Sequence, residues 1–212
     1  MGCIRQRFDS AQPDKIVFME INQDQIDRLG EILKANKTLQ AILQRADSLG
    51  MSNWYLGAGC ISQTVWNILH GFEPESSIKD YDLVYYDATD TSYAGEDVYV
   101  QKGKELFSDL PAALDIINEA RVHLWIEKKH GYKIAQYKSV EDAISTWPTT
   151  ITCVGVRYED GKLKVYATFG LDDVFNMVLR PNKKIVTEEV YMNKVKKWTK
   201  TWPKLTVIGW NE

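Results

Sequence analysis

The chain has 212 residues and a formal net charge of −3, with 44% hydrophobic and 26% charged residues. This composition is that of an ordinary globular protein, and it excludes a polycation that binds nucleic acid through its overall charge. No apolar run approaches the roughly 18 residues that span a bilayer, and no secretory signal peptide is visible. The three cysteines are widely spaced and form no Cys-x-x-Cys pair, which favours reduced thiols in a cytoplasmic protein over a zinc site.

The first 50 residues are predicted to be mainly helical. Residues 1–20 show no clear period, and only a short strand is predicted there, at 16–18. Between residues 22 and 49, apolar side chains recur every three or four positions. This pattern predicts two amphipathic helices with a break near residues 36–38, and Gly50 is expected to end the second.

A strand, a glycine turn and a helix are predicted to follow one another at residues 53–69. The strand covers 53–56, the turn contains Gly57 and Gly59, and the helix covers 60–69. Because glycine has no Cβ, backbone N–H groups in such a turn can approach a ligand closely. The helix begins with unpaired N–H groups and a partial positive charge, which suits a phosphate. Gly59 has an equally good alternative role, which is to permit tight packing between strand and helix.

Three acidic residues occupy the next two predicted strands. Asp80 and Asp82 open a strand over residues 80–86, so their side chains point to the same face. Asp115 lies between apolar residues in a strand at 112–117 and is expected to converge on them. Three neighbouring carboxylates repel one another, and Mg²⁺, which prefers oxygen ligands, would remove the conflict. Glu119, one helical turn further on, is an alternative to Asp115.

The rest of the chain alternates short helices and strands. Helices are predicted at 93–110, 118–129, 139–147, 171–179 and 187–201, a hairpin at 150–158 and 162–168, and a last strand or tail at 206–208. No internal repeat or low-complexity linker is present. We therefore expect one domain over residues 1–212, with a helical arm at 1–49, a core at 50–130 and an extension at 131–212.

The glycine turn, the paired acids and the later lone acid together resemble the nucleotidyltransferase fold of the DNA polymerase beta type. More narrowly, the chain resembles bacterial nucleotidyltransferase-like proteins once grouped only as a domain of unknown function. Most of the chain from about residue 53 shares in this resemblance, through segments at 56–59, 64–67, 80–82, 118–125, 147–150, 169–173, 180–182 and 202–205. The turn departs from the pattern, because it is Gly-Ala-Gly where many members have Gly-Gly or Gly-Ser. Ser62 or Thr64 would then supply the hydroxyl that contacts phosphate.

The resemblance implies a mixed α/β fold, with a mixed sheet flanked by helices, and a Mg²⁺-dependent enzyme. Such an enzyme transfers a nucleoside monophosphate from an NTP to an acceptor and releases pyrophosphate. Two Mg²⁺ ions, or Mn²⁺ in their place, would be held by Asp80, Asp82 and Asp115, and Asp115 would also help to deprotonate the acceptor. The turn from Gly57 to Gly59 would hold the β- and γ-phosphates. The alternative is a nucleotide-binding or interaction protein that keeps the fold without turnover.

Basic residues offer further candidates for contact with the nucleotide. Arg121 suits a triphosphate, because its guanidinium forms bidentate hydrogen bonds, whereas His123 is expected to be a satisfied core histidine. The basic stretch from 180 to 204 is expected to be a mainly solvated helix face, and a wall that attracts anions is the sharper alternative. Its lysines at 194, 196, 197 and 200 do not form one row, so a small-molecule acceptor is expected rather than nucleic acid.

Overall fold

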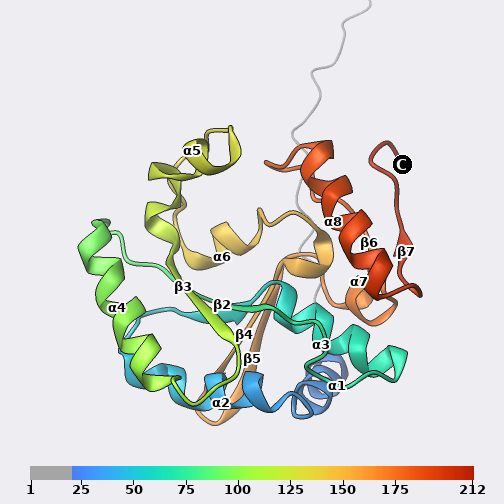
Figure 1. The fold of residues 1–212 in the computed structure, drawn as a ribbon, viewed down its shortest axis with the longest axis horizontal. Coiled ribbons are helices and arrows are strands. Elements are labelled where there is room, and N and C mark those ends of the chain that lie inside the picture. Colours follow the sequence, from blue (N-terminus) through green and yellow to red (C-terminus); the bar gives the residue numbers. More distant parts are fainter. Residues whose placement is uncertain (1–20) are drawn as a thin grey trace, which may run out of the picture.

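A computed structural model describes residues 21–212, apart from the side chain of His130. Its centre is a five-stranded sheet in the order β3-β2-β1-β4-β5, flanked by helices (Figure 1). The strands are β1 (Tyr55–Gly57), β2 (Asp80–Tyr85), β3 (Ala113–Asn118), β4 (Val154–Glu159) and β5 (Lys162–Ala167). Strands β2 and β3 run parallel and the other neighbours run antiparallel, so the predicted mixed sheet is confirmed.

Three helices pack against one face of this sheet: α1 (Gln23–Leu33), α2 (Lys37–Arg45) and α3 (Gly59–His70). The two predicted N-terminal helices are confirmed, and a short 3-10 turn at Ala46–Leu49 follows them. Asn36 caps the N-terminus of α2, because its Oδ1 accepts a hydrogen bond from the backbone N–H of Leu39 at 2.8 Å. The strand predicted at 16–18 lies outside the described residues.

Strand β2 shows which face of the sheet is core and which is free. Tyr81, Leu83 and Tyr85 are buried in the main hydrophobic core with the helices on that side. Because strand side chains alternate, Asp80 and Asp82 point to the opposite face. The two-residue alternation of side chains along β2 is therefore sufficient to direct these acids away from the core.

Helical segments precede and follow the edge strand β3. Helix α4 (Tyr93–Leu106) comes before β3 in the chain and packs along it, and its bounds are close to those predicted. The single helix predicted at 118–129 is instead a 3-10 segment, η2 (Glu119–Leu124), and a separate helix α5 (Ile126–His130). The 3-10 form begins where the Asn118 side chain accepts from the N–H of Ala120 at 3.1 Å. The backbone of Trp125, with φ of −128°, then separates the two pieces.

The C-terminal third contains the predicted hairpin of β4 and β5, which turns at Asp160 and Gly161. The first residues of the strand predicted at 150–158 instead form a 3-10 turn (Thr150–Thr152), so β4 begins at Val154. Helix α6 (Val140–Ile144) precedes this turn. The helix predicted at 171–179 ends early, as α7 (Asp172–Phe175), because Met177 adopts a positive φ of 54°. Strand β6 (Val178–Leu179) then pairs in parallel with β7 (Thr206–Val207).

The long helix α8 (Glu188–Thr201) is attached to α3 through tryptophans. Trp66 of α3 lies edge-on to Trp198 at 5.5 Å and to Trp202 at 5.2 Å between ring centroids. These contacts, expected for core tryptophans, bring α8 to the edge of the free sheet face (Figure 1). Within residues 21–212 no helix is both long and apolar enough to cross a membrane.

Candidate active site

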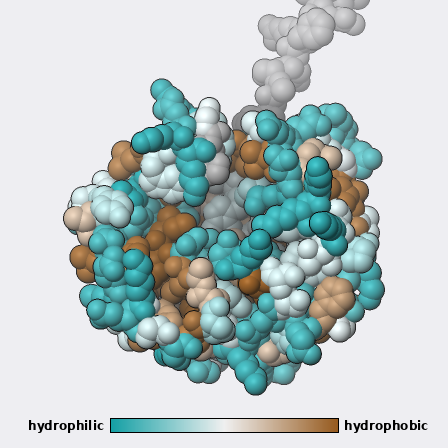
Figure 2. All heavy atoms as spheres, in the orientation of Figure 1, coloured by the Kyte–Doolittle hydropathy of each residue, from teal (hydrophilic) through white to brown (hydrophobic). Residues whose placement is uncertain are grey.

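A cleft of about 370 Å³ lies over the free face of the sheet, at the carboxylates of β2 and β3. Its floor is formed by Asp80, Asp82 and Asp115, and its walls come from the start of α3, from α8 and from the segment after α6. Figure 1 shows two of the contributing helices, α5 and α8, on opposite sides of the view above the sheet. Figure 2 shows the face hollowed there, with hydrophilic residues along the α8 side. All three acids predicted as site residues are therefore brought together.

The strand register explains why the acids meet. Asp82 and Asp115 are direct partners in the parallel pair of β2 and β3. Neighbouring strands lie about 4.8 Å apart, so the two side chains leave the same face of the sheet next to each other. Asp80 is two residues earlier on β2 and points to the same side.

The acids oppose one another's ionisation. Burial raises the pKa of Asp82 to about 7, and the charges of Asp80 and Asp115 add to this effect. Glu119 is only 4% exposed and lines the same cleft, and its carboxyl group has no hydrogen-bond or ion-pair partner among the described residues. Burial is the main cause that raises its pKa to about 8, followed by the charges of Asp82 and Glu96.

The acids are not arranged as a finished metal centre. Among residues 21–212, no group of three or more His, Cys, Asp or Glu side chains could hold a metal ion as it stands. The convergence of Asp80, Asp82 and Asp115 on one cleft is thus observed, whereas their role as ligands stays a prediction. Asp115 is the register partner of Asp82, and Glu119 lies further along the same strand direction.

The glycine turn joins β1 to α3 at the edge of this cleft. Gly57 is the last residue of β1, and a Cβ there would meet Val154 O at 2.7 Å and the Trp147 ring at 3.0 Å. Its missing side chain therefore serves packing within the sheet. Ala58 and Gly59 line the cleft, and Ala58 has φ of 58° and ψ of −133°, a conformation that favours glycine. Helix α3 begins without a side-chain cap from the described residues, so its first N–H groups are available at the cleft.

Several other predicted site residues have different partners. Ser62 is buried and donates to Gly59 O at 3.3 Å, and the Thr64 hydroxyl donates to Cys60 O at 2.7 Å. Neither residue lines the cleft, where Gln63 is found instead, so their positions do not support a hydroxyl contact with phosphate. The reason is helical geometry, since adjacent residues of α3 point in different directions.

Arg121 lies away from the cleft and has a structural role. It is buried, forms an ion pair with Glu96, and donates from Nε to Thr91 O at 3.3 Å. These contacts attach η2 to the start of α4, so the guanidinium is not directed at the cleft. His123 differs from a satisfied core histidine, because its buried Nδ1 has no partner among the described residues.

The cationic side chains of the cleft come mainly from α8, which the sequence predicted to present a mainly solvated face. Lys194 and Lys197 line the cleft opposite the acids, and Lys129 of α5 lines it as well. Burial and Lys197 lower the pKa of Lys194, while Asp82 and Asp80 oppose this shift. Positions 194 and 197 are three apart and so share one side of the helix, a spacing that was readable in the sequence. The sequence does not show, however, that α8 lies beside the acids in the fold.

Comparison with known proteins agrees with this geometry. One solved structure is similar to the chain with a TM-score of 0.69 and 26% sequence identity, over 86% of this chain and 95% of the other. It is described as an NMR structure that reveals a CCA-adding enzyme head domain. No curated protein matches the chain. Fold and cleft together define an enzyme of the nucleotidyl-transfer class.

A nucleotidyltransferase family model matches residues 44–207, which is most of the chain. The chain therefore belongs to this nucleotidyltransferase family. The match begins at the end of α2 and ends in β7, so it includes every element that lines the cleft.

Proposed function

We propose that the protein transfers a nucleoside monophosphate from an NTP to a small-molecule acceptor, with release of pyrophosphate. One observation carries this proposal: Asp80, Asp82 and Asp115 converge on one cleft that also contains an uncapped helix N-terminus and lysines. Family membership supports nucleotidyl transfer in general. The acceptor class, the metal and the pyrophosphate product belong to the proposal.

The acid cluster fits a divalent metal. Burial and mutual repulsion raise the pKa of Asp82, so the ionised cluster is costly without a cation. Carboxylate oxygens are the ligands that Mg²⁺ prefers, and it commonly binds one or two carboxylates together with substrate phosphates. Asp80, Asp82 and Asp115 would hold two Mg²⁺ ions, or Mn²⁺ in their place. When bound, these ions would neutralise charge on the attacking and leaving oxygens.

The triphosphate has a binding region on the α3 and α8 sides of the acids. The first N–H groups of α3, next to Ala58 and Gly59, offer donors and a partial positive charge to the β- and γ-phosphates. Lys194 and Lys197 face the same space and would offset the remaining negative charge. With the β- and γ-phosphates bound there, the α-phosphate would lie over the carboxylates of β2 and β3.

Asp115 lies on the edge strand β3 and is, of the three acids, the one furthest from β1 and the glycine turn. We assign it the proton of the acceptor hydroxyl. The acceptor oxygen forms a bond to the α-phosphorus while the bond from that phosphorus to the bridging oxygen breaks. Pyrophosphate leaves with the bonding electron pair, and the proton passes from the hydroxyl to the carboxylate and on to solvent.

The alternative is a nucleotide-binding protein that retains the fold without turnover. Two variants separate these functions. Asp82→Asn should abolish stabilisation of the protein by Mg-NTP in thermal melts while leaving a folded chain. Asp115→Asn should keep Mg-NTP affinity within a few-fold and lose turnover, as expected for a group that acts mainly in the transition state. If wild type binds Mg-NTP but releases no pyrophosphate with any acceptor pool, the non-catalytic alternative is correct.

A further inference from the structure

A second pocket opens beyond the acid cluster, at the end of β3. It has a volume of about 150 Å³ and a mainly apolar lining that includes Val122, Trp125, Ile126, Tyr137, Ile185 and Val186. Its polar groups are few, and the Tyr137 hydroxyl is already bonded to Thr146 Oγ1 at 2.7 Å. Ile117, Glu119, Trp147 and Pro148 line both this pocket and the cleft, so the two spaces adjoin.

A third pocket adjoins the opposite end of the cleft and is basic. Lys79, Lys197 and Lys200 line it, together with Asp80 and Gln63 from the cleft. It shares no lining residue with the apolar pocket. Three spaces thus follow one another: a basic one, the acid cleft and an apolar one.

The strand register gives this row a direction and a length. Asp80 lies at the start of β2, Asp82 and Asp115 are partners further on, and Glu119 follows the end of β3. Because β2 and β3 are parallel, the row runs along both strands from the basic end to the apolar end. Five strand positions at about 3.3 Å each give about 17 Å from the level of Asp80 to Asn118, the residue directly before Glu119.

We propose that the apolar pocket holds a single-ring, mainly apolar group of the acceptor, next to the hydroxyl that receives the nucleotide. This assignment rests on the proposed function. In phosphoryl-type transfer the attacking and leaving oxygens lie roughly in line. Pyrophosphate leaves toward the basic end, so the acceptor oxygen approaches from the apolar end, past Asp115.

The size of the pocket sets the class of group. A cavity of about 150 Å³ with an apolar lining is large enough for benzene. The acceptor group is therefore the size of one six-membered ring, whereas a fused two-ring system exceeds the space. Four residues line both pocket and cleft, and Glu119 is the one among them with an ionisable side chain.

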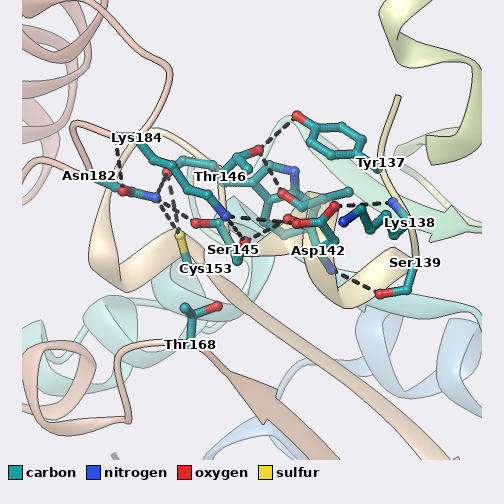
Figure 3. Close-up of polar contacts among 12 residues, drawn as sticks. Tyr137, Lys138, Ser139, Asp142, Ser145, Thr146, Cys153, Thr168, Asn182 and Lys184 are labelled. Atoms are coloured by element: carbon teal, nitrogen blue, oxygen red, sulfur yellow. Dashed lines mark hydrogen bonds and ion pairs between the residues drawn. The ribbon is translucent and has the colours of Figure 1, made fainter. Parts of the chain in front are cut away.

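The wall between pocket and cleft is held in place by side-chain hydrogen bonds. Buried Asn182 donates from Nδ2 to Ser145 O and to Trp147 O, both at 2.9 Å. Lys184 reaches the Ser145 hydroxyl at 2.8 Å, so the end of α6 is fixed from two positions (Figure 3). Trp147 and Pro148 follow directly, so these bonds hold the wall that separates the pocket from the cleft.

The test uses 4-fluorobenzyl alcohol, a single ring that bears a hydroxymethyl group, and follows its fluorine NMR line width with the full chain. Ile185→Trp fills the pocket at a half-buried position, and Val186→Phe is a second filling variant. Leu124→Trp is the matched control, because Leu124 is 59% exposed and lines neither space. Wild type and the control should broaden the probe, both filling variants should weaken its binding tenfold or more, and a fluorinated naphthylmethanol should not bind.

Mg-NTP stabilisation of the same samples is measured in parallel. If Mg-NTP binds and the probe does not, or if the filling variants bind the probe as wild type does, the acceptor pocket is wrong while the proposed function stands. If Mg-UTP or Mg-CTP displaces the probe and Mg-ATP does not, the pocket holds the nucleobase, and the acceptor assignment is overturned. If no Mg-NTP stabilises wild type, the proposed function fails, and the acceptor assignment fails with it.

Discussion

The Nε1 of Trp202 donates a hydrogen bond to Oδ1 of Asn67 at 2.7 Å, and this buried contact fixes the end of α8 to α3. The other side of the Asn67 amide donates to Pro74 O at 2.9 Å and to Ser76 O at 2.8 Å. One side chain therefore positions both the lysine-bearing helix and the loop that leads into the acid strand.

Replacing Asn67 by Ala should destabilise the fold, because the buried Trp202 N–H and the half-buried carbonyls of Pro74 and Ser76 lose their partner. A buried unsatisfied group costs about 1–3 kcal/mol and the half-buried carbonyls can bond to water, so we expect a loss of about 2 kcal/mol or more in the free energy of unfolding. Trp202→Phe removes only one of the three bonds and should cost less. Urea unfolding of both variants measures this, and an equal or smaller loss for Asn67→Ala would contradict the shared role.

The lysines of α8 should contribute unequally to nucleotide binding. Both side chains are exposed, but Lys197 lines the cleft and Lys196 lies outside it. Lys197→Ala should weaken Mg-NTP binding about tenfold, on the order of 1.4 kcal/mol. Lys196→Ala has the same change in net charge and should leave affinity nearly unchanged. Equal effects in calorimetric titrations would mean that only the overall charge matters.

The turn residue Ala58 should be a source of strain. Its φ of 58° and ψ of −133° lie outside the regions favoured by residues with a Cβ, which costs about 1–3 kcal/mol. Ala58→Gly should therefore stabilise the protein by about 1 kcal/mol after the entropic cost of glycine, a rise of about 2–4 °C in Tm. Asn53→Gly is the control, because asparagine tolerates its φ of 47°. A lower Tm for Ala58→Gly would contradict this strain.

Stability without nucleotide should fall as pH rises, partly because of Glu119. Its pKa is 4.5 in the unfolded chain and about 8 when folded, so the folded state holds the extra proton between these values. Folded-state stability is therefore lost progressively from pH 4.5 to 8, by about 1.4 kcal/mol per pH unit at most. Glu119→Gln cannot ionise and should show a shallower decline in denaturant midpoints over pH 5–8. An unchanged slope would show that the carboxyl is already ionised.

Much of this site was predictable because it depends on local pattern. The period of two places Asp80 and Asp82 on one face, and the apolar neighbours of Asp115 put it in a strand. The direct partnership of Asp82 with Asp115 follows from the parallel pairing of β2 and β3, whereas the sequence predicted only that the third acid lies near the other two. The confirmed hairpin turn at Asp160 and Gly161 is likewise a local signal.

Other features depend on tertiary contacts that the sequence does not display. Arg121 is an arginine of the kind that binds phosphate, yet its ion pair with Glu96 links segments 25 residues apart. Lys194 and Lys197 form part of the cleft only because Trp198 and Trp202 pack on Trp66. The sequence favoured a solvated helix face for these lysines, because nothing in the local sequence distinguishes a lysine that faces solvent from one that faces a cleft.

Nucleotidyl transfer to a small molecule is tested directly by following the α-phosphorus and the β,γ-phosphates of the same NTP. Each of the four NTPs, labelled at the α-position, is incubated with wild type, Mg²⁺ and a small-molecule metabolite extract, and Asp82→Asn serves as the control. We predict Mg²⁺-dependent transfer of the label to a small molecule, with one pyrophosphate released per label transferred and neither product from Asp82→Asn. Release of inorganic phosphate without label transfer, or equal transfer by Asp82→Asn, would contradict it.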